Sequence, residues 1–200
     1  MISKMSLLLS NYFARKGVYP LKKIRVYQYG FELLLSTIIN LLGILFTAVF
    51  MGIILEAIFF CIGFISLRRM AGGYHAKHHW SCIIGFNVIF SVFAVFHQYL
   101  NERFTSTYLL FAMIMSTIFI WLLAPVEAVN KPLGDSHKNR QRKKSTALIC
   151  FSLVATLSLC HFELHDDYRT IFAFYISGIF AASLSLVAAI VANGRENVAT

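Results

Sequence analysis

The segment RRMAGGYHAKHHWSC, residues 68–82, gathers reactive groups in a chain that is otherwise apolar. It holds one cysteine, Cys82, together with three histidines and two arginines. A thiol is a poor nucleophile until it is deprotonated, and a nearby imidazole or cationic group favours the thiolate. The segment therefore predicts a cysteine nucleophile that works with a histidine base.

Spacing alone leaves the choice of histidine open. On a continuous helix, His78 and His79 lie four and three positions before Cys82 and share its face. His75 lies seven positions before Cys82, about 10 Å along a helix axis, and reaches the sulfur only if the chain bends. By spacing, His78 and His79 rank first. The adjacent Gly72-Gly73 pair allows backbone conformations closed to other residues, and exposed N–H groups there could stabilise an oxyanion.

Other interpretations of the segment are simpler. Three histidines and a cysteine could hold zinc, because imidazole and thiolate are its usual ligands. The spacing His-x2-His-His-x2-Cys fits no standard zinc motif, so we expect neither a metal nor another cofactor. Basic residues such as Arg69 and Lys77 near the ends of membrane spans commonly only set topology. Cys61, Cys150 and Cys160 lie in or at the end of apolar runs and are expected to be small buried hydrophobes.

The elements that position this segment are apolar helices. Hydrophobic residues make up 58% of the 200 residues and charged residues only 14%. Apolar runs long enough to cross a bilayer, at roughly 20 residues each, recur along the chain. We expect an all-α, multi-pass membrane protein that forms a single domain over residues 1–200. The expected six spans are two within Phe31–Leu67, split by a turn near Gly52, and then Trp80–Tyr99, Thr107–Leu123, Thr146–Cys160 and Thr170–Ala192.

Charge placement predicts the topology of these spans. With both termini in the cytoplasm, all of the 18 Lys and Arg residues except Arg103 and Arg169 fall on the cytoplasmic side. The segment with Cys82 then also lies on that side. The net charge of +9 is explained by topology and by contact with an anionic lipid bilayer, so no nucleic-acid partner is expected. The basic stretch HKNRQRKKS, residues 137–145, is expected to be a cytoplasmic loop.

Two further expectations concern the first twenty residues of the chain and the polar residues within the spans. In the first twenty residues, apolar side chains recur on one helical face, a pattern typical of a helix in the inner membrane interface that ends at Pro20. Polar groups within spans are costly in lipid and should make interhelical contacts. The polar residues within or near spans are Asn40, Glu56 and Asn87. The apolar face of the N-terminal helix consists of Ile2, Met5, Leu8, Leu9, Tyr12 and Phe13.

Two motifs of the chain resemble the AgrB family, the accessory gene regulator protein B of Gram-positive bacteria. The family pattern has an Arg, then Gly-x-His-Ala, then a Cys seven residues after the His. In this sequence these positions are Arg68, Gly73, His75, Ala76 and Cys82. The stretch APVEAVNKPL, residues 124–133, is similar to the segment that follows the fourth span in the family. Length, basic character and six-span layout also agree.

The resemblance implies a membrane cysteine endopeptidase that processes a short precursor of the AgrD type into a cyclic quorum-sensing peptide. The nucleophile then corresponds to Cys82 and the catalytic histidine to His75, on a bent loop, against the ranking by spacing. Arg68 and Gly73 correspond to supporting positions, and the resemblance also implies a homodimer. Glu127 is a candidate third group, although an interfacial acid paired with Lys or Arg is the simpler interpretation. A small peptide transporter without proteolytic chemistry is the rival function.

Overall fold

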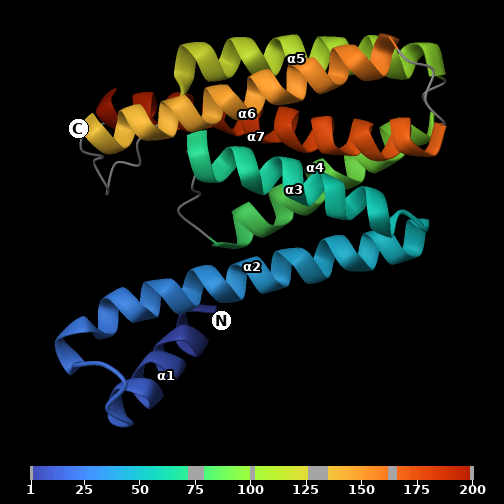
Figure 1. The fold of residues 1–200 in the computed structure, drawn as a ribbon. Helices are drawn as coiled ribbons and strands as arrows, with labels where there is room; N and C mark the ends of the chain where they lie inside the picture. Colours follow the sequence, from blue (N-terminus) through green and yellow to red (C-terminus); the bar gives the residue numbers. More distant parts are fainter. Residues whose placement is uncertain (1, 72–78, 100–101, 126–134, 162–165, 199–200) are drawn as a thin grey trace. The chain divides into compact units, whose positions relative to one another are not determined.

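The computed structural model describes residues 2–71, 79–99, 102–125, 135–161 and 166–198, and its regular elements over these residues are all helical (Figure 1). The expectation of an all-α chain is therefore confirmed for the described residues. Within these residues, a short 3-10 helix, Leu21–Lys23, separates the first two of seven α-helices. These are α1 (Ile2–Arg15), α2 (Ile24–Met51), α3 (Ile54–Ala71), α4 (His79–Gln98), α5 (Glu102–Leu123), α6 (Asp135–His161) and α7 (Asp166–Val198).

Three helical segments are long and apolar enough to cross a membrane, namely Ile24–Met51, Ser106–Leu123 and Tyr168–Val191. The shorter segment Ile83–His97 is apolar as well. Large hydrophobic side chains are exposed on these helices, and Phe50 of α2 reaches 86% exposure. Such surfaces suit lipid rather than water. The chain thus has the features of a membrane protein, while the count of six spans stays a prediction.

Helix boundaries confirm one expectation about the spans and correct another. The break between α2 and α3 lies at Gly52, where the turn was predicted, and the φ of Gly52, 71°, is a left-handed conformation that favours glycine. The basic stretch of residues 137–145 is not a loop, because α6 begins at Asp135 and includes all of it. Lys, Arg and Gln are good helix formers, so a run of basic residues does not by itself indicate a loop between helices.

The N-terminal helix ends earlier than predicted. We expected Pro20 to end it, but α1 ends at Arg15. Gly17 follows with φ 74°, its N–H donates to the carbonyl of Ala14, and the N–H of Val18 donates to the carbonyl of Phe13. These two bonds form a Schellman C-cap, in which glycine takes the left-handed position. The cap satisfies carbonyls that the helix end would otherwise leave unpaired.

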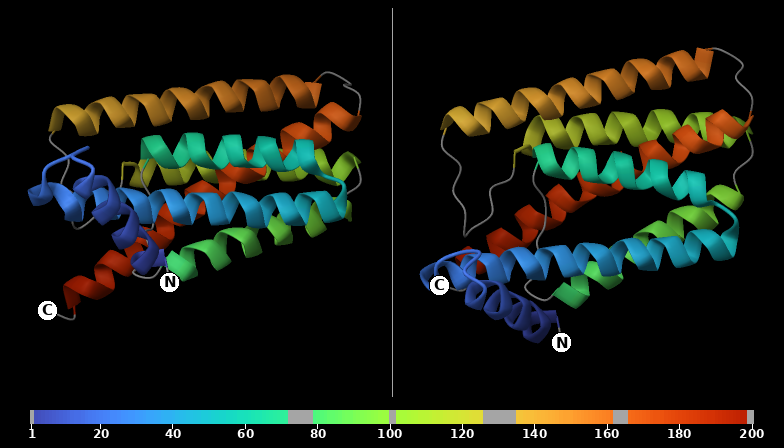
Figure 2. Two further views of the ribbon diagram at one scale, coloured as in Figure 1. Left: turned by 90° about the horizontal axis from the view of Figure 1, so that it is seen from below. Right: turned by 60° about the horizontal axis from the view of Figure 1, so that its bottom comes forward.

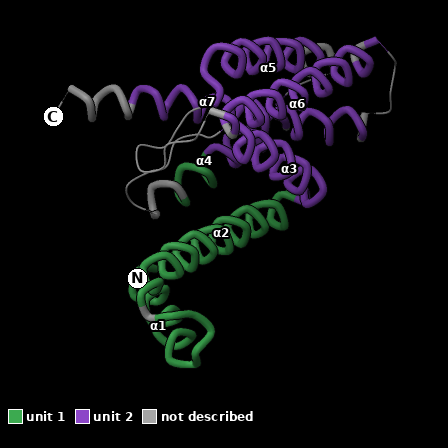
Figure 3. The backbone as a smooth tube through the Cα atoms, turned by 60° about the vertical axis from the view of Figure 1, so that its left-hand side comes forward, with its two compact units in different colours: residues 1–51, 76–88 green, residues 52–75, 89–200 purple. Residues whose placement is uncertain are grey.

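The contacts of the chain fall into two compact units, which Figure 3 colours separately. Unit 1 comprises residues 1–51 and 76–88, and unit 2 comprises residues 52–75 and 89–200. The helix α4 begins in unit 1 and ends in unit 2. The expectation of a single domain stays a prediction, and the two units are described separately.

In unit 1, α1 folds back along α2 (Figures 1 and 2). The face of α1 that packs inward is not its apolar one, because the buried side chains beyond Ile2 are Ser6, Ser10 and Ala14. Small side chains let the two helices approach closely. Met5, Leu8 and Tyr12 of the predicted apolar face are exposed, so the placement of that face in the membrane interface stays a prediction.

In unit 2, α7 is the central helix and packs against α3 and α5. An aromatic core joins these helices to the second part of α4. The ring centroids of Phe60 and Phe90 lie 5.2 Å apart, and those of Phe90 and Phe174 lie 6.5 Å apart. This core holds the C-terminal part of α3, which carries Arg68, in place within its unit.

Candidate functional site

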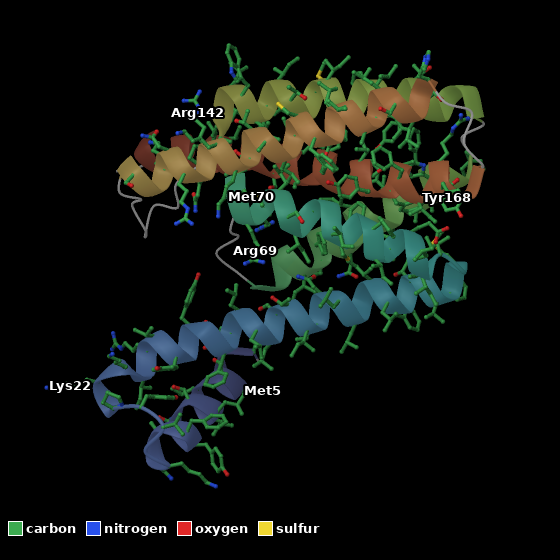
Figure 4. The ribbon with its side chains drawn as sticks, in the orientation of Figure 1. Met5, Lys22, Arg69, Met70, Arg142 and Tyr168 are labelled. Carbon is green, nitrogen blue, oxygen red and sulfur yellow. The ribbon has the colours of Figure 1, made fainter. Side chains whose placement is uncertain are left out.

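The two arginines of the predicted site, Arg68 and Arg69, lie in the last turn of α3. The guanidinium carbon of Arg68 lies 5.5 Å from the centroid of the Phe64 ring, one turn earlier on the same helix. This contact holds a half-buried cation near the helix end, where it also meets the negative end of the helix dipole. Arg69 is exposed and lies beside Met70 in the last turn (Figure 4).

The start of α4 supplies the predicted nucleophile. Cys82 is the fourth residue of this helix, and the structure describes its backbone but not its side chain. The first four N–H groups of a helix have no partner within the helix, and they give its start a partial positive charge. A thiolate is stabilised there, and a developing oxyanion can accept from the free N–H groups. The backbone position of Cys82 thus suits a nucleophilic thiol.

The other predicted site residues of the loop lie outside the described residues. These are Gly73, His75 and His78, and Glu127 of the second motif is outside as well. His79 is the first residue of α4, three positions before Cys82, so the two share one face of the helix. The described residues therefore bring together the backbones of His79 and Cys82, and the choice among the three histidines stays open.

Unit 1 contains a polar contact next to the start of α4. The Asn87 side-chain amide donates from Nδ2 to Oδ1 of Asn40 on α2, at 3.2 Å, and to the carbonyl of Ile83, at 2.9 Å. A Cβ on Gly43 of α2 would meet the Asn87 amide, so alanine at that position would require the Asn87 side chain to shift. The predicted interhelical role of Asn40 and Asn87 is confirmed. Glu56, the third such residue, lies in the first turn of α3, where the helix dipole favours a carboxylate.

The sequence analysis did not identify a row of polar residues on α2 that ends at Asn40, the partner of Asn87. Glu32 accepts hydrogen bonds from Oγ of Ser6, at 3.2 Å, and from Nε2 of Gln28, at 3.3 Å. Ser36 is buried, and its Oγ has no hydrogen-bond partner among the described residues. The signal was present in the sequence, since polar residues recur every four positions in an otherwise apolar helix. The row consists of Gln28, Glu32, Ser36 and Asn40.

Unit 2 contains a buried polar junction that sequence reading also missed. Nε2 of His97 lies 2.9 Å from Oγ of Ser177, and the Tyr108 hydroxyl lies 2.7 Å from the same atom. Oγ of Ser177 donates to the carbonyl of Ala173 at 2.8 Å. The junction is then complete if His97 and Tyr108 both donate to Ser177, which joins α4, α5 and α7. Since the Ser177 hydroxyl, the Tyr108 hydroxyl and Nε2 of His97 all have partners, we interpret the junction as a structural contact between the three helices.

Two predictions from the sequence concern a metal site and the burial of the cysteines outside the loop. Over the described part of the chain, no group of three or more His, Cys, Asp or Glu side chains could hold a metal ion. Most of the histidine-rich loop lies outside the described residues, and metal analysis of the purified protein tests the zinc interpretation. Cys61 is half-buried and Cys150 is exposed, so the expectation of burial was wrong for Cys150. An apolar run in a membrane helix can face lipid as well as protein.

Comparison with known proteins identifies a family and several relatives that the sequence of this chain resembles. Residues 6–188 match the family described as accessory gene regulator B. A putative AgrB-like protein of Clostridium perfringens is 25% identical over 154 residues, which cover 74% of this chain and 72% of that protein. The accessory gene regulator protein B of Staphylococcus aureus is 28% identical over 160 residues, 79% of each chain. The FsrB protein of Enterococcus faecalis is 28% identical over 132 residues, 65% of this chain and 54% of FsrB.

No solved structure matches the chain. The family match includes both the end of α3, with Arg68, and the start of α4, with Cys82. It also covers most of the sequence, from the middle of α1 to the later part of α7. The chain therefore belongs to the accessory gene regulator B (AgrB) family.

Proposed function

We propose that the chain is a membrane cysteine endopeptidase that cleaves a short quorum-sensing precursor of the AgrD type and promotes its cyclisation. Membership of the AgrB family supports a role in the processing of autoinducing peptides in quorum sensing. The observation that carries the proposal is the position of Cys82 in the first turn of α4, inside the family match. No other described element combines a cysteine with the start of a helix.

The first step is acylation of Cys82. A loop histidine, His75 by the family pattern, takes the thiol proton, and the thiolate sulfur attacks a peptide carbonyl in the C-terminal part of the precursor. The C–S bond forms, and the N–H groups at the start of α4 stabilise the oxyanion. The C–N bond then breaks, and the histidine returns the proton to the departing amine. An acyl-thioester remains on Cys82.

The second step is ring closure. A Cys or Ser side chain upstream in the bound precursor gives its proton to the histidine and attacks the thioester carbonyl. The new C–S or C–O bond forms, the bond to the Cys82 sulfur breaks, and the Cys82 thiolate leaves. The product is a thiolactone or a lactone, and the enzyme is restored. Water would compete as the nucleophile, so the site must exclude it, which the edge of a membrane helps to achieve.

The remaining assignments complete the proposal. By the family pattern, Arg68 is proposed to orient the precursor, and Gly73 is proposed to let the precursor backbone approach the loop. Glu127 is a candidate third group. The active site lies on the cytoplasmic side of the cell membrane, both termini are cytoplasmic, and the protein acts as a homodimer without a metal. These points rest on charge placement and on the family pattern.

A small peptide transporter is the rival function. Transporters tend to carry ionisable groups near the middle of the bilayer, on broken helices. The Lys and Arg residues of this chain are instead concentrated in residues 4–25, at the end of α3 and at the start of α6. This placement of the cationic groups favours chemistry at a membrane edge over transport.

Trapping the intermediate tests the proposal. A cognate precursor whose ring-forming Cys or Ser is replaced by Ala cannot cyclise, so acyl-enzyme should accumulate. Mass spectrometry of the reconstituted protein is expected to find the acyl group on Cys82, removable by hydroxylamine as a thioester should be. Cleavage at a normal rate with no adduct on Cys82 would contradict the mechanism.

A further inference from the structure

The helix α1, the 3-10 helix and the first two turns of α2 form a helical hairpin, the N-terminal hairpin, over residues 2–31 of unit 1. Five cationic side chains gather around its turn, and all five are exposed. No Asp or Glu precedes Glu32 in the sequence, and the Glu32 carboxylate accepts hydrogen bonds from Ser6 and Gln28. The turn therefore carries a strong positive charge. The five residues, called the hairpin cations below, are Arg15, Lys16, Lys22, Lys23 and Arg25.

The length of α2 places these cations near the edge of a bilayer. The helix has 28 residues, which correspond to about 42 Å, whereas the hydrocarbon core of a bilayer is about 30 Å thick. Residues 33–51 contain no charged side chain and by themselves fit that core. Residues 24–32 then extend beyond it by about 13 Å, into the layer of the lipid headgroups and the water next to it.

The outer face of α1 is apolar, although the helix packs beside this outer part of α2. Its inner face is lined by small side chains, and its outer face exposes Met5, Leu8 and Tyr12, at 46%, 70% and 53%. The ammonium group of Lys16 lies 5.1 Å from the centroid of the Tyr12 ring. A helix with an apolar face and cations at its rim is typical of a membrane surface, where acyl chains cover the apolar side chains.

Hydrogen bonds and a ring stack fix the turn of the N-terminal hairpin. The Tyr19 hydroxyl donates to the carbonyl of Ser10 at 2.6 Å, and Oγ of Ser10 donates to the carbonyl of Ile24 at 3.0 Å. The rings of Tyr19 and Tyr27 are stacked, with centroids 3.7 Å apart. Lys22 points away from the two helices at this turn (Figure 4). The backbone that carries the cations is thus ordered before any ligand binds, which reduces the entropy lost on binding.

We propose that the N-terminal hairpin binds the headgroups of anionic phospholipids, with the hairpin cations on the phosphates and the acyl chains on the outer face of α1. Clusters of Lys and Arg beside a membrane span attract anionic headgroups, and their long side chains reach the phosphate layer. A phospholipid supplies a negative charge and an apolar chain in one molecule, and the hairpin presents a match for both. The inference goes beyond the proposed function, because none of these residues belongs to the Cys82 site.

Counting bound lipids tests the proposal. The full chain in detergent is titrated with phosphatidylglycerol or with phosphatidylcholine of the same acyl chains, and native mass spectrometry measures the fraction of protein that retains lipid. The parent should retain phosphatidylglycerol at lower concentration than phosphatidylcholine. In the triple variant Lys22→Gln/Lys23→Gln/Arg25→Gln, phosphatidylglycerol should bind roughly a hundredfold more weakly, at roughly fivefold per cation, while phosphatidylcholine binds as before.

A matched triple variant on α6 separates a site from general attraction. Arg140→Gln/Lys143→Gln/Lys144→Gln removes the same charge from exposed positions of α6. We expect this variant to bind phosphatidylglycerol within about twofold of the parent. Equal losses in the two triple variants would show that only net charge matters, and they would overturn a site in the N-terminal hairpin.

The arrangement of the cations is tested without changing their number. Gly17→Ala keeps all the hairpin cations but strains the turn, since Gly17 has a φ of 74°. Its affinity for phosphatidylglycerol should fall severalfold. Gly30→Ala is the control, because a Cβ there has no described neighbour within 4 Å, and it should bind as the parent does. Parental affinity in Gly17→Ala, with its thermal unfolding midpoint lowered, would show that the geometry of the turn is irrelevant and would overturn the proposal.

A hexaglutamate peptide tests the alternative that the surface binds an acidic peptide. Retention of hexaglutamate at lower concentration than phosphatidylglycerol, lost in the triple variant of the hairpin, would assign the surface to such a peptide and overturn the lipid assignment. Preferred retention of phosphatidylglycerol, lost in the triple variant of the hairpin and kept in that of α6, would support it.

Discussion

Gly63 of α3 and Gly178 of α7 mark a crossing at which the two helix backbones touch. A Cβ on Gly63 would collide with the carbonyl oxygen of Tyr175, and a Cβ on Gly178 would collide with that of Phe60. Glycines at such crossings let membrane helices approach closely, and close approach is a main source of their association. Because Arg68 follows Gly63 on α3, this crossing also fixes the end of α3 within unit 2.

Alanine at either glycine should destabilise unit 2. The added methyl group meets backbone atoms, which cannot move aside as a flexible side chain can, and overpacking of this kind costs roughly 1–3 kcal/mol. We expect Gly63→Ala and Gly178→Ala to lower the thermal unfolding midpoint in detergent. Gly30→Ala, on an uncrowded face of α2, is the control. Equal midpoints for all three variants would show that the crossing is not tight.

The buried junction of unit 2 predicts a second loss of stability. Ser177→Ala leaves Nε2 of His97 and the Tyr108 hydroxyl without their shared acceptor. A buried polar group without a partner costs about 1–3 kcal/mol. Thermal unfolding should therefore occur at a lower temperature in Ser177→Ala. Ser158→Ala, which changes an exposed serine of α6, should unfold as the parent does, and a Ser177 variant as stable as that control would refute the junction.

Parts of the fold were predictable from residue chemistry. Gly52 lies between two apolar runs and could be identified as a turn because glycine takes a positive φ at little cost. Asn40 and Asn87 could be identified as interhelical contacts because amides in apolar helices need partners. The start of α6 was missed because its basic residues resemble a loop, although they are good helix formers.

The candidate site was predictable in type but not in geometry. A thiol, histidines and arginines in one segment point to nucleophilic chemistry, and the structure adds that Cys82 lies in the first turn of α4. The row with Glu32 was missed because its partners come from α1 and α4, which are distant in the sequence. His97, Tyr108 and Ser177 were missed for the same reason, since three helices contribute one residue each.

Metal removal separates a thiol site from a zinc site. If Cys82 acts as a nucleophile, EDTA and 1,10-phenanthroline should leave precursor cleavage unchanged, and iodoacetamide should abolish it. Cleavage rates after dialysis against chelator, together with the metal content of the purified protein, provide the measurement. Stoichiometric zinc that is lost together with activity would reverse this assignment.

The three histidines of the loop predict different effects on Cys82. If His75 is the base, His75→Ala should slow acylation by roughly 10² to 10⁴, the usual contribution of a positioned acid–base group. The imidazolium favours the thiolate, so without it alkylation of Cys82 should require higher pH, and the profile should move upward. His78→Ala and His79→Ala should change the profile much less.

The contrary result would identify a different base. If the profile moves upward in His78→Ala or His79→Ala and not in His75→Ala, then the base is a neighbour of Cys82 on one continuous helical face. The family pattern would then not apply to this histidine, and the ranking by spacing would be correct.

The most direct measurement is cleavage of the cognate precursor by Cys82→Ala protein in lipid vesicles. The account predicts that cleavage is abolished while the protein still inserts and folds, as shown by unchanged thermal unfolding. Cys61→Ala, Cys150→Ala and Cys160→Ala should each keep nearly full activity under the same conditions. Full cleavage by Cys82→Ala would contradict the central claim that this thiol is the nucleophile.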